Sequence, residues 1–276
     1  MSSSSTSATG ATAAPPRAVR RAALVAHGRP EVLGDAVARV RRCAAAAGVE
    51  LFDGECADPD LIVALGGDGT MLRALRGCLA APAPVFGVNF GRVGFLTSIR
   101  GSELDQGLAR VFAGDFKVVE LCTLAVRFDD GPEVAVNDVV VTSSQPGRMV
   151  ELEWEIGGEA LGRQPCDGLI CSTPTGSTAY NLSSGGPVLM WGLDAMAITF
   201  VAPHSLQARP LVVPRGLGLR VTNRTPDVPV SVLVDGHAVA ELAAGEPAEV
   251  GLGMDTSLLA LLPEVTFFTR YHDIFT

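Results

Sequence analysis

Lysine, paired cysteines and long apolar runs are scarce or missing in this sequence, and each shortage excludes a class of protein. Lys117 is the single lysine and lies in Asp-Phe-Lys-Val, so the chain can form neither a Gly-Lys-Ser/Thr phosphate-binding loop nor the lysine motif of a protein kinase. The six cysteines form no Cys-x-x-Cys pair and the four histidines are scattered, so we expect no metal site and no disulfide framework. We interpret the cysteines as buried, inert thiols and expect a cytoplasmic protein.

Membrane and nucleic-acid partners are not expected either. The sequence contains no run of roughly 18 apolar residues, the length that a membrane-spanning helix needs. Residues 1–16 have neither the charge nor the apolar stretch of a secretory signal, and we expect residues 1–19 to form a disordered tail. The formal net charge is −9, which leaves no diffuse basic field to attract nucleic acid or anionic lipid.

The chain does contain enough apolar sequence for a sizeable core, because 47% of its 276 residues are hydrophobic. Between residues 20 and 117, short apolar segments alternate with helical patterns. Strands are predicted at residues 20–27, 61–65 and 84–89, and helices at residues 31–47, from residue 70 onward and at residues 103–112. This alternation favours a parallel sheet covered on both faces, so residues 20–117 predict a Rossmann-like α/β domain.

Beyond residue 117 the pattern changes to short Val- and Leu-rich segments with no convincing helix between them. Residues 150–156 alternate between apolar side chains and glutamates, which is typical of a strand with one solvent face. Further strands are predicted at residues 122–128, 134–142, 197–201, 219–222 and 230–234. We expect residues 118–261 to form an all-β, sandwich-like domain of two antiparallel sheets.

The last segment, residues 262–276, is expected to pack back on the first domain. It carries four aromatic residues, Phe267, Phe268, Tyr271 and Phe275. An exposed chain end would not keep four such rings in water. The predicted α/β domain therefore includes this segment as well.

The sharpest motif is Gly-Gly-Asp-Gly-Thr at residues 66–70, directly after the apolar strand 61–65. Glycines at the carboxyl end of a strand let a backbone approach a phosphate closely. Asp68 is then presented at the mouth of the sheet, where a carboxylate can accept a proton. A second interpretation is equally open for this motif alone, in which Asp68 only caps the following helix.

Two further motifs combine polar residues with apolar strands. A strand from Asp167 opens into a run of Ser, Thr, Pro and Gly at residues 172–178, whose neutral donors and acceptors suit ribose and amide groups. The alternative for this run is a turn that caps a helix at about residues 178–182. Asn137 and Asp138 form a polar pair inside an apolar strand, and buried polar groups need a partner from the backbone or from a ligand.

Together these motifs resemble those of the NAD kinase family, whose members use ATP to phosphorylate NAD to NADP. The resemblance begins at about Arg20 and covers nearly all of the remaining chain. It rests on residues 66–70, 87–96, 137–138, 166–180, 184–187, 203–206, 209–211 and 235–236. It implies phosphoryl transfer to the 2′-hydroxyl of the adenosine ribose of NAD, Mg²⁺ as the cation that accompanies ATP, and a homodimer or homotetramer. The sequence leaves open whether polyphosphate can replace ATP as the donor.

The resemblance implies a role for each matching residue near the two central motifs. Asp68 matches the proton acceptor for the 2′-hydroxyl, Gly69 a position against the dinucleotide, and Arg73 a basic position that faces phosphate. Asn137 and Asp138 match a pair that contacts the adenosine end of NAD, with Asp138 in place of the usual Glu.

The other implied NAD contacts lie later in the chain. Arg148 matches a basic position that contacts the dinucleotide, Asp167 a residue near the nicotinamide, and His237 stands where the family often has Gln. The segment that lines the nucleotide pocket consists of Thr178, Ala179, Tyr180, Asn181, Leu182 and Ser183. We interpret His204 as a structural rather than a catalytic histidine.

Two other functions are weighed against this reading. A lipid or sugar kinase would share a similar Gly-Gly-Asp-Gly-Thr turn, although residues 137–138 and 175–180 argue against both. A non-catalytic NAD(P)-binding sensor on the same fold would be expected to have lost the carboxylate at position 68, and Asp68 retains it.

Overall fold

The structure, a computed structural model, describes residues 18–28, 30–54, 56–91, 94–128 and 131–276. It divides into two compact units. The N-terminal unit contains residues up to 74, 83–119 and 258–276, and the C-terminal unit contains residues 75–82 and 120–257. The predicted tail lies outside the described residues up to residue 17. Its predicted end is wrong, because Val19 is buried in the N-terminal core and donates its N–H to the carbonyl of Phe112 (3.2 Å).

The N-terminal unit is built on a parallel sheet with the strand order β4-β3-β1-β2. Its strands are β1 (Arg21–Ala26), β2 (Glu50–Asp53), β3 (Leu61–Leu65), β4 (Val85–Asn89) and the short β5 (Ile99–Arg100) beside β4. Its helices are α1 (Pro30–Ala47), α2 (Asp68–Gly77), α3 (Leu104–Phe112) and α5 (Phe267–Phe275), with the 3₁₀ turn η1 (Gly101–Glu103) before α3. The α/β architecture predicted from the alternating pattern is therefore confirmed.

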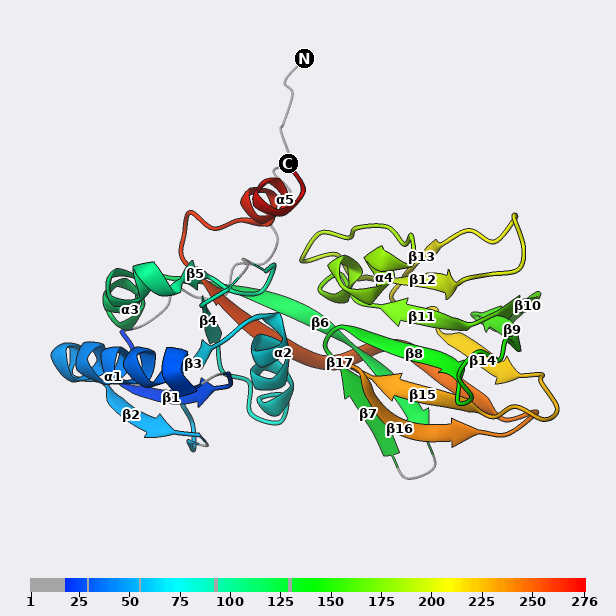
Figure 1. The fold of residues 1–276 in the computed structure, drawn as a ribbon, viewed down its shortest axis with the longest axis horizontal. Helices are drawn as coiled ribbons and strands as arrows, with labels where there is room; N and C mark the ends of the chain where they lie inside the picture. Colours follow the sequence, from blue (N-terminus) through cyan, green and yellow to red (C-terminus); the bar gives the residue numbers. More distant parts are fainter. Residues whose placement is uncertain (1–17, 29, 55, 92–93, 129–130) are drawn as a thin grey trace, which may run out of the picture. The chain divides into compact units, whose positions relative to one another are not determined.

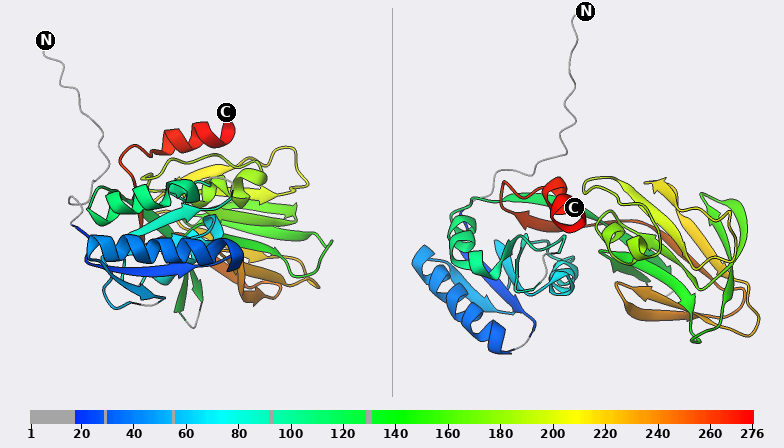
Figure 2. Two further views of the ribbon diagram at one scale, coloured as in Figure 1. Left: turned by 60° about the vertical axis from the view of Figure 1, so that its left-hand side comes forward. Right: turned by 45° about the horizontal axis from the view of Figure 1, so that its top comes forward.

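Helices cover both faces of this parallel sheet, as the pattern predicts. α1 and α3 lie side by side (Figure 1, Figure 2), and their Val40 and Leu108 belong to the same apolar core as one face of β3 and β4. On the other face, a Cβ on Gly87 of β4 would lie 2.5 Å from the Sδ of Met71 in α2. Since both faces are covered, the carboxyl-end edge of the strands is the part of the sheet that remains available for polar turns.

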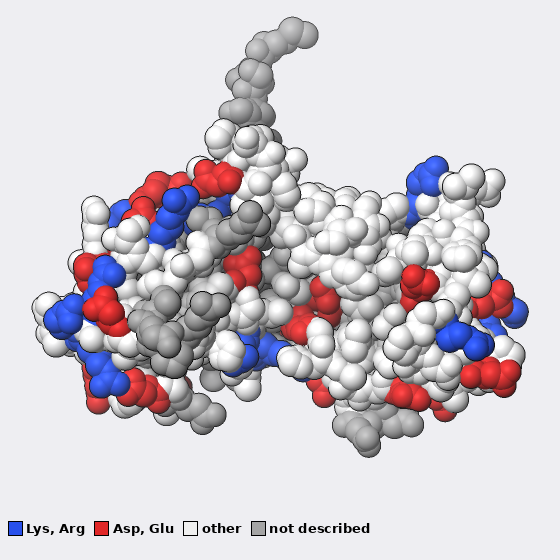
Figure 3. Space-filling view, viewed as in Figure 1, with Lys and Arg blue, Asp and Glu red and all other residues white. Residues whose placement is uncertain are grey.

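The charged surface of this unit mixes both signs. Figure 3 shows Lys and Arg side chains interleaved with Asp and Glu over α1 and α3. Arg39 of α1 pairs with Asp105 of α3 (2.8 Å), and Arg110 pairs with Asp115 (2.6 Å) and Glu264 (2.5 Å). These arginines are engaged by acidic neighbours and do not form a basic field.

The C-terminal unit consists of two packed sheets whose facing side chains form one apolar core. One sheet contains β6 (Lys117–Phe128), β7 (Gly131–Ala135), β9 (Val150–Ile156), β10 (Glu159–Cys166), β14 (Leu219–Asn223) and β17 (Pro247–Leu261). The other, in the order β13-β12-β11-β8-β15-β16, contains β8 (Asp138–Ser143), β11 (Gly168–Ser172), β12 (Ala195–Val201), β13 (Leu211–Pro214), β15 (Val230–Val234) and β16 (His237–Leu242). The strand pairs of this second sheet are antiparallel, which confirms the predicted sandwich.

The prediction of one strand over residues 134–142 is wrong. β7 and β8 belong to different sheets. Between them, the carboxylate of Asp235 accepts the N–H groups of Val136 (2.9 Å), Asn137 (2.7 Å) and Asp138 (3.2 Å). Because these N–H groups donate to a side chain and not to a neighbouring strand, the chain can leave the sheet of β7 and enter the sheet of β8. An acceptor about a hundred residues away leaves no mark in the local sequence.

The C-terminal helix α5 packs on the N-terminal unit, as predicted. The ring of Phe95 lies between those of Phe267 and Phe275, with centroid distances of 5.9 and 5.7 Å. The expectation that all four aromatic rings leave water is wrong, because Phe268 is 65% exposed. The aromatic content of the segment therefore predicts that it docks, and does not predict which rings are covered.

Candidate active site

The Gly-Gly-Asp-Gly turn leaves β3 at the carboxyl end of the parallel strands. The N–H of Gly66 donates to the carbonyl of Val88 in β4 (3.0 Å), which ties the turn to the neighbouring strand. The N–H of Met71 donates to the carbonyl of Gly67 (3.1 Å), which opens α2. Asp68 is the first residue of this helix, so strand, turn and helix fix its position together.

The carboxylate of Asp68 is held by a second loop and not by its own helix. Its two oxygens accept the N–H groups of Phe95 (2.9 Å) and Leu96 (3.2 Å). A Cβ on Gly94 would lie 2.1 Å from Asp68 Oδ1, so the backbone approaches the carboxylate more closely than any side-chain-bearing residue allows. The alternative interpretation of Asp68 as a helix cap is therefore wrong for this structure.

The environment of Asp68 suits a proton acceptor. Burial raises the pKa of its carboxyl, while the N–H groups of Leu96 and Phe95 and the positive charge of Arg270 favour the ionised form and lower that pKa. The first effect is the larger one, so the pKa lies above its ordinary value. A carboxylate with a raised pKa is a stronger base toward a hydroxyl proton.

Two basic side chains lie beside the glycine turn. Nη1 of Arg73, one turn into α2, lies 3.2 Å from Nδ1 of His27, which follows β1. The N–H of His27 donates to the carbonyl of Leu65 at the end of β3 (3.1 Å). Both side chains are exposed, as is Gly69. His27 is not among the site residues predicted from the sequence, although its place directly after an apolar strand puts it at the same sheet edge as Asp68.

In the C-terminal unit, three separate segments meet at Asn137, and we call this group the Asn137 corner: residues 136–138, 173–176 and 235. Asp235 has a φ of +48° in the turn between β15 and β16, and its N–H donates to the carbonyl of Asp138 (3.0 Å). The N–H of Thr173 donates to the carbonyl of Asn137 (2.9 Å). A Cβ on Gly176 would lie 2.2 Å from that carbonyl oxygen, so only glycine permits this approach.

The polar atoms of the Asn137 corner are incompletely paired. The buried Oδ1 of Asn137 has no hydrogen-bond partner among the residues that the structure describes. Asp138 is buried, and burial raises the pKa of its carboxyl to about 7, with a further contribution from the negative charge of Asp235. Buried polar groups in native proteins are nearly always satisfied, so these two side chains are available to a polar ligand.

Most hydroxyls of the run at residues 172–178 donate to backbone carbonyls of the protein, which leaves the lone pairs of their oxygens as the groups that could accept from a ligand. Thr173 donates to the carbonyl of Val136 (2.7 Å), Ser177 to that of Pro174 (2.7 Å) and Thr178 to that of Thr175 (3.3 Å). The capping alternative is wrong. Neither the 3₁₀ turn η2 (Gly176–Thr178) nor the short α4 (Tyr180–Ser183) has a side-chain cap.

Asn181 supports the pocket segment and does not line it. Its Nδ2 donates to the carbonyls of Ser177 and Pro187 (3.0 Å each), and its Oδ1 accepts the hydroxyl of Thr199 (2.7 Å). The side chain is fully buried, and its polar atoms are paired within the protein. The residues around it offer more accessible surface: Thr178, Ala179 and Leu182 are half-buried, and Tyr180 and Ser183 are exposed.

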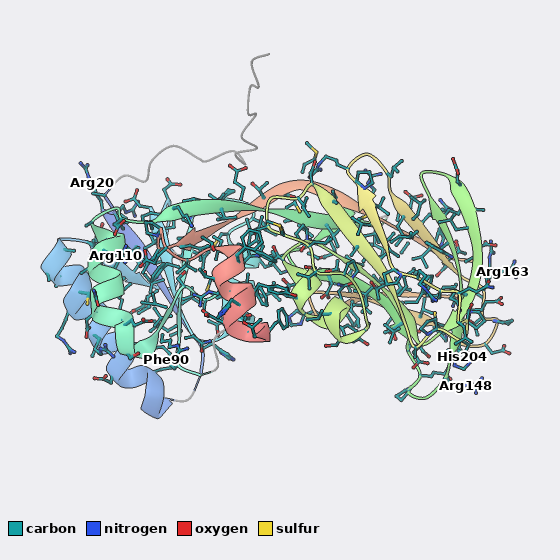
Figure 4. All side chains as sticks on the ribbon, turned by 90° about the horizontal axis from the view of Figure 1, so that it is seen from above. Arg20, Phe90, Arg110, Arg148, Arg163 and His204 are labelled. Atoms are coloured by element: carbon teal, nitrogen blue, oxygen red, sulfur yellow. The ribbon has the colours of Figure 1, made fainter. Side chains whose placement is uncertain are left out.

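Arg148 and Asp167 lie at the opposite end of the second sheet from the Asn137 corner. Ser172 of β11 pairs with Asp138 of β8, and Asp167 lies just before the other end of β11. At about 3.3 Å per residue, the two ends of this strand are roughly 16 Å apart. Val150, two residues after Arg148, pairs with Cys166, which precedes Asp167, and Figure 4 shows Arg148 at the outer end of the unit. One copy of the chain therefore does not bring Arg148 and Asp167 together with the Asn137 corner.

His204 and His237 are both exposed. His237 is the first residue of β16 and directly follows the turn that carries Asp235, so the structure places it beside the Asn137 corner. The side chain of His204 makes no hydrogen bond with the described part of the chain, which gives no support to the structural role predicted for it.

In the described parts of the chain, no group of three or more His, Cys, Asp and Glu side chains could hold a metal ion. None of the six cysteines, all of which are described, forms a disulfide. Burial raises the pKa of Cys166 to about 12 and also raises that of Cys171. Both are buried, as predicted, whereas the other four are only half-buried.

Comparisons with known proteins place this geometry in a family. The ATP-NAD kinase N-terminal domain matches residues 45–116, and the ATP-NAD kinase C-terminal domain matches residues 136–258. The NAD kinase of Heliobacterium modesticaldum is 44% identical over 216 residues, which cover 76% of this chain and 76% of that protein. The chain belongs to the NAD kinase family.

Further members of the family give the same result. The NAD kinase of Gemmatimonas aurantiaca is 41% identical over 219 residues, covering 76% of this chain and 75% of that protein. An Archaeoglobus fulgidus NAD kinase in complex with ATP superposes with a TM-score of 0.77 at 26% identity, covering 92% and 99% of the two chains. Yeast NADH kinase complexed with NADH has the same fold, with a TM-score of 0.81 at 22% identity, covering 96% and 92%. In the described residues, no helix is long and apolar enough to cross a membrane.

Proposed function

We propose that the kinase transfers the γ-phosphoryl group of ATP to the 2′-hydroxyl of the adenosine ribose of NAD, with Asp68 as the proton acceptor. The bond between the γ-phosphorus and the β,γ-bridging oxygen breaks, a bond from the same phosphorus to the ribose oxygen forms, and the hydroxyl proton passes to Asp68. ADP and NADP are the products. The observation that carries this proposal is the carboxylate of Asp68, held by two backbone N–H groups at the carboxyl end of the sheet.

Asp68 would act by positioning and by basicity. A ribose hydroxyl is a poor nucleophile near neutral pH, and a carboxylate within hydrogen-bond reach accepts its proton as the new bond forms. Such general-base assistance contributes about 10²- to 10⁴-fold. The two N–H donors fix the carboxylate before substrate arrives, so little reorganisation is needed during the reaction.

The Asn137 corner would recognise the adenosine end of NAD. The unpartnered Oδ1 of Asn137 accepts a hydrogen bond from an amino or hydroxyl group, and the carboxylate of Asp138 accepts one from a ribose hydroxyl. Asp235 would act indirectly, because its carboxylate holds the backbone of both residues. The accessible ring of Tyr180 offers a stacking surface.

The basic pair beside the glycine turn would hold phosphates. Arg73 and His27 lie next to the N-terminus of α2, whose free N–H groups also favour an anion. Mg²⁺ would enter on the triphosphate, because Asp68 is the single acidic side chain at this described turn and one carboxylate is too few for a protein cage. When bound, Mg²⁺ neutralises charge that develops on the transferring phosphoryl group.

Several parts of the proposal rest on the family resemblance. Arg148 and Asp167, at the far end of the second sheet, would contact NAD away from its adenosine. Cytoplasmic location, a homodimer or homotetramer, and polyphosphate as an alternative donor also belong to the proposal.

A single assay separates this function from the alternatives. Purified protein would be supplied with Mg²⁺, ATP and either NAD, diacylglycerol or fructose 6-phosphate. We expect NADP to form and neither control acceptor to be phosphorylated. Phosphorylation of a lipid or sugar in place of NAD would contradict the proposal, and NAD binding without turnover would indicate a sensor.

A further inference from the structure

Arg270 is the most deeply buried charged residue of the described C-terminal helix. It is only 7% exposed, although its neighbours Phe268 and Tyr271 are 65% and 42% exposed. Its Nη2 donates to the carbonyls of Thr97 and Ser98, each at 2.6 Å. A guanidinium is thus withdrawn from water to bind two consecutive backbone carbonyls of a distant loop.

The loop that Arg270 binds is the one that holds Asp68. Residues 94–98 present the N–H groups of Phe95 and Leu96 to the Asp68 carboxylate. The next two carbonyls along this loop, at residues 97 and 98, accept from Arg270. One short backbone segment therefore connects the guanidinium to the carboxylate, and α5 supplies the only side chain of the described residues that bonds to both carbonyls.

Aromatic contacts reinforce the same connection. Phe95 packs between Phe267 and Phe275, at centroid distances of 5.9 and 5.7 Å. These two rings lie before and after Arg270 on α5. The helix therefore holds the loop through apolar contacts at Phe95 and through hydrogen bonds at the next residues, and it restricts the direction in which the Phe95 and Leu96 N–H groups point.

The charge of Arg270 also acts on Asp68. Arg270 remains protonated despite burial, because arginine is effectively always charged in proteins. The other charges that act on it are Asp273 on its own helix and, near η1, Glu103 and Arg100. Its Nε has no acceptor among the described residues. Burying a guanidinium with incomplete pairing is costly, and arrangements of this kind are found where the charge itself has a use.

We propose that Arg270 is a positioning residue for the proton acceptor, so that α5 is part of the catalytic apparatus. Arg270 holds the 94–98 loop in the conformation that binds the Asp68 carboxylate, and its positive charge favours the ionised carboxylate. The inference rests on the proposed role of Asp68. It assigns to the C-terminal helix a function that goes beyond covering the core.

The test compares Arg270→Gln with Arg270→Lys, and uses Arg110→Gln as a matched control. Arg110 also ties the C-terminal segment to the N-terminal unit, through Glu264 (2.5 Å), and has no hydrogen bond to the 94–98 loop. Turnover would be measured from pH 5 to 9 at saturating NAD and Mg·ATP, with thermal unfolding and NAD binding measured on the same samples. At saturating NAD, the titration of Asp138 affects KM and does not affect kcat.

We expect Arg270→Gln to lower kcat roughly tenfold or more and to move the acid limb of the pH profile to higher pH, because a charge that favours the ionised carboxylate is lost. Arg270→Lys should keep the acid limb at its original pH and lose only part of kcat, and Arg110→Gln should leave both unchanged. A purely structural role for Arg270 would lower stability without moving the acid limb.

Wild-type kcat and an unmoved acid limb in Arg270→Gln would overturn the inference. If Arg270→Gln does not fold, Arg270→Lys tests the inference in its place. Wild-type kcat in a folded Arg270→Lys variant would show that the guanidinium is not needed. Asp68→Asn in the same assay separates the two proposals. An active Asp68→Asn variant would remove the role of Asp68, whereas an inactive one beside a normal Arg270→Gln variant would remove only the role of Arg270.

Discussion

At the scale of single residues, two carboxyl groups with raised pKa values have different proposed roles. The carboxylate of Asp68 is fixed by backbone N–H groups, and its raised pKa suits it to accept a proton. Asp138 accepts no hydrogen bond through its carboxyl from the described residues, and its pKa of about 7 places its ionisation in the physiological range. The first group should therefore govern turnover and the second should govern affinity for NAD.

The affinity for NAD should increase with pH through the titration of Asp138. Below pH 7 its carboxyl is protonated and loses acceptor capacity, and above pH 7 the carboxylate accepts a ribose hydroxyl. If only the ionised form binds, the dissociation constant should fall about tenfold between pH 6 and pH 8. Isothermal calorimetry without ATP would measure this, and Asp138→Asn should abolish the slope while Asp138→Glu keeps it. A slope that survives in the Asn variant would assign the titration to another group.

Arg73 should bind phosphates of the donor. Its side chain is exposed beside His27 at the start of α2, and loss of a charge-assisted hydrogen bond costs about 1.5–3 kcal/mol. We expect Arg73→Ala to raise KM for ATP tenfold or more and to change KM for NAD little. Arg41→Ala is the control, because Arg41 is an exposed arginine of α1 that pairs with Asp53. A rise confined to KM for NAD would place Arg73 against the dinucleotide instead.

At the scale of elements, the active-site turn depends on a glycine in a different loop. A Cβ on Gly94 would collide with the Asp68 carboxylate at 2.1 Å, whereas a Cβ on Gly91 would come no closer than 3.7 Å to Asn89 Oδ1. We expect Gly94→Ala to lower kcat at least tenfold by displacing the carboxylate, and Gly91→Ala to have little effect. Steady-state kinetics with a thermal unfolding control would test this. Normal turnover in Gly94→Ala would show that the close approach is dispensable.

The elements that the sequence predicted well are those whose signal is local. The apolar run of β3 and the alternation of β9 each predict a strand, because the apolar or polar character of each residue indicates which side of the strand is buried. The long strand β17 escaped prediction because its first part contains Gly251, Gly253 and a 92%-exposed Met254, which resemble a loop. Strand pairing across the fold, and not propensity, makes this segment extended.

The residues of the candidate site also differ in whether the local sequence predicts them. Asp68, Asn137 and Asp235 lie in recognisable motifs, although the backbone partners of Asp235 are about a hundred residues away. His27 and Arg270 lie in no such motif and act through contacts with distant segments. Asn181 is the opposite case. Its motif predicts a contact with the ligand, whereas its side chain is buried and hydrogen-bonded within the protein. A motif therefore identifies where polar chemistry is concentrated, and only the structure separates the groups that face a ligand from those that hold the fold.

At the scale of the whole molecule, the proposed roles are divided between the two units. The N-terminal unit supplies Asp68, Arg73 and Arg270, and the C-terminal unit supplies Asn137 and Asp138. α2 and the strands β6 and β17 run from one unit into the other. The chain thus keeps the phosphoryl-transfer residues on the parallel sheet and the proposed adenosine-recognition residues on the sandwich.

The central claim is that the Asp68 carboxylate accepts the ribose proton, and Asp68→Asn tests it most directly. Asn has nearly the same size, and its Oδ1 can still accept an N–H from the 94–98 loop, so the fold should be retained. Binding of NAD by calorimetry and turnover by coupled NADP detection would be compared on one preparation. We predict that NAD binds normally while kcat falls by roughly two orders of magnitude or more, because the lost interaction is made chiefly in the transition state. An Asn variant that retains most of its turnover would contradict the account and leave Asp68 as a residue that only positions the ligand.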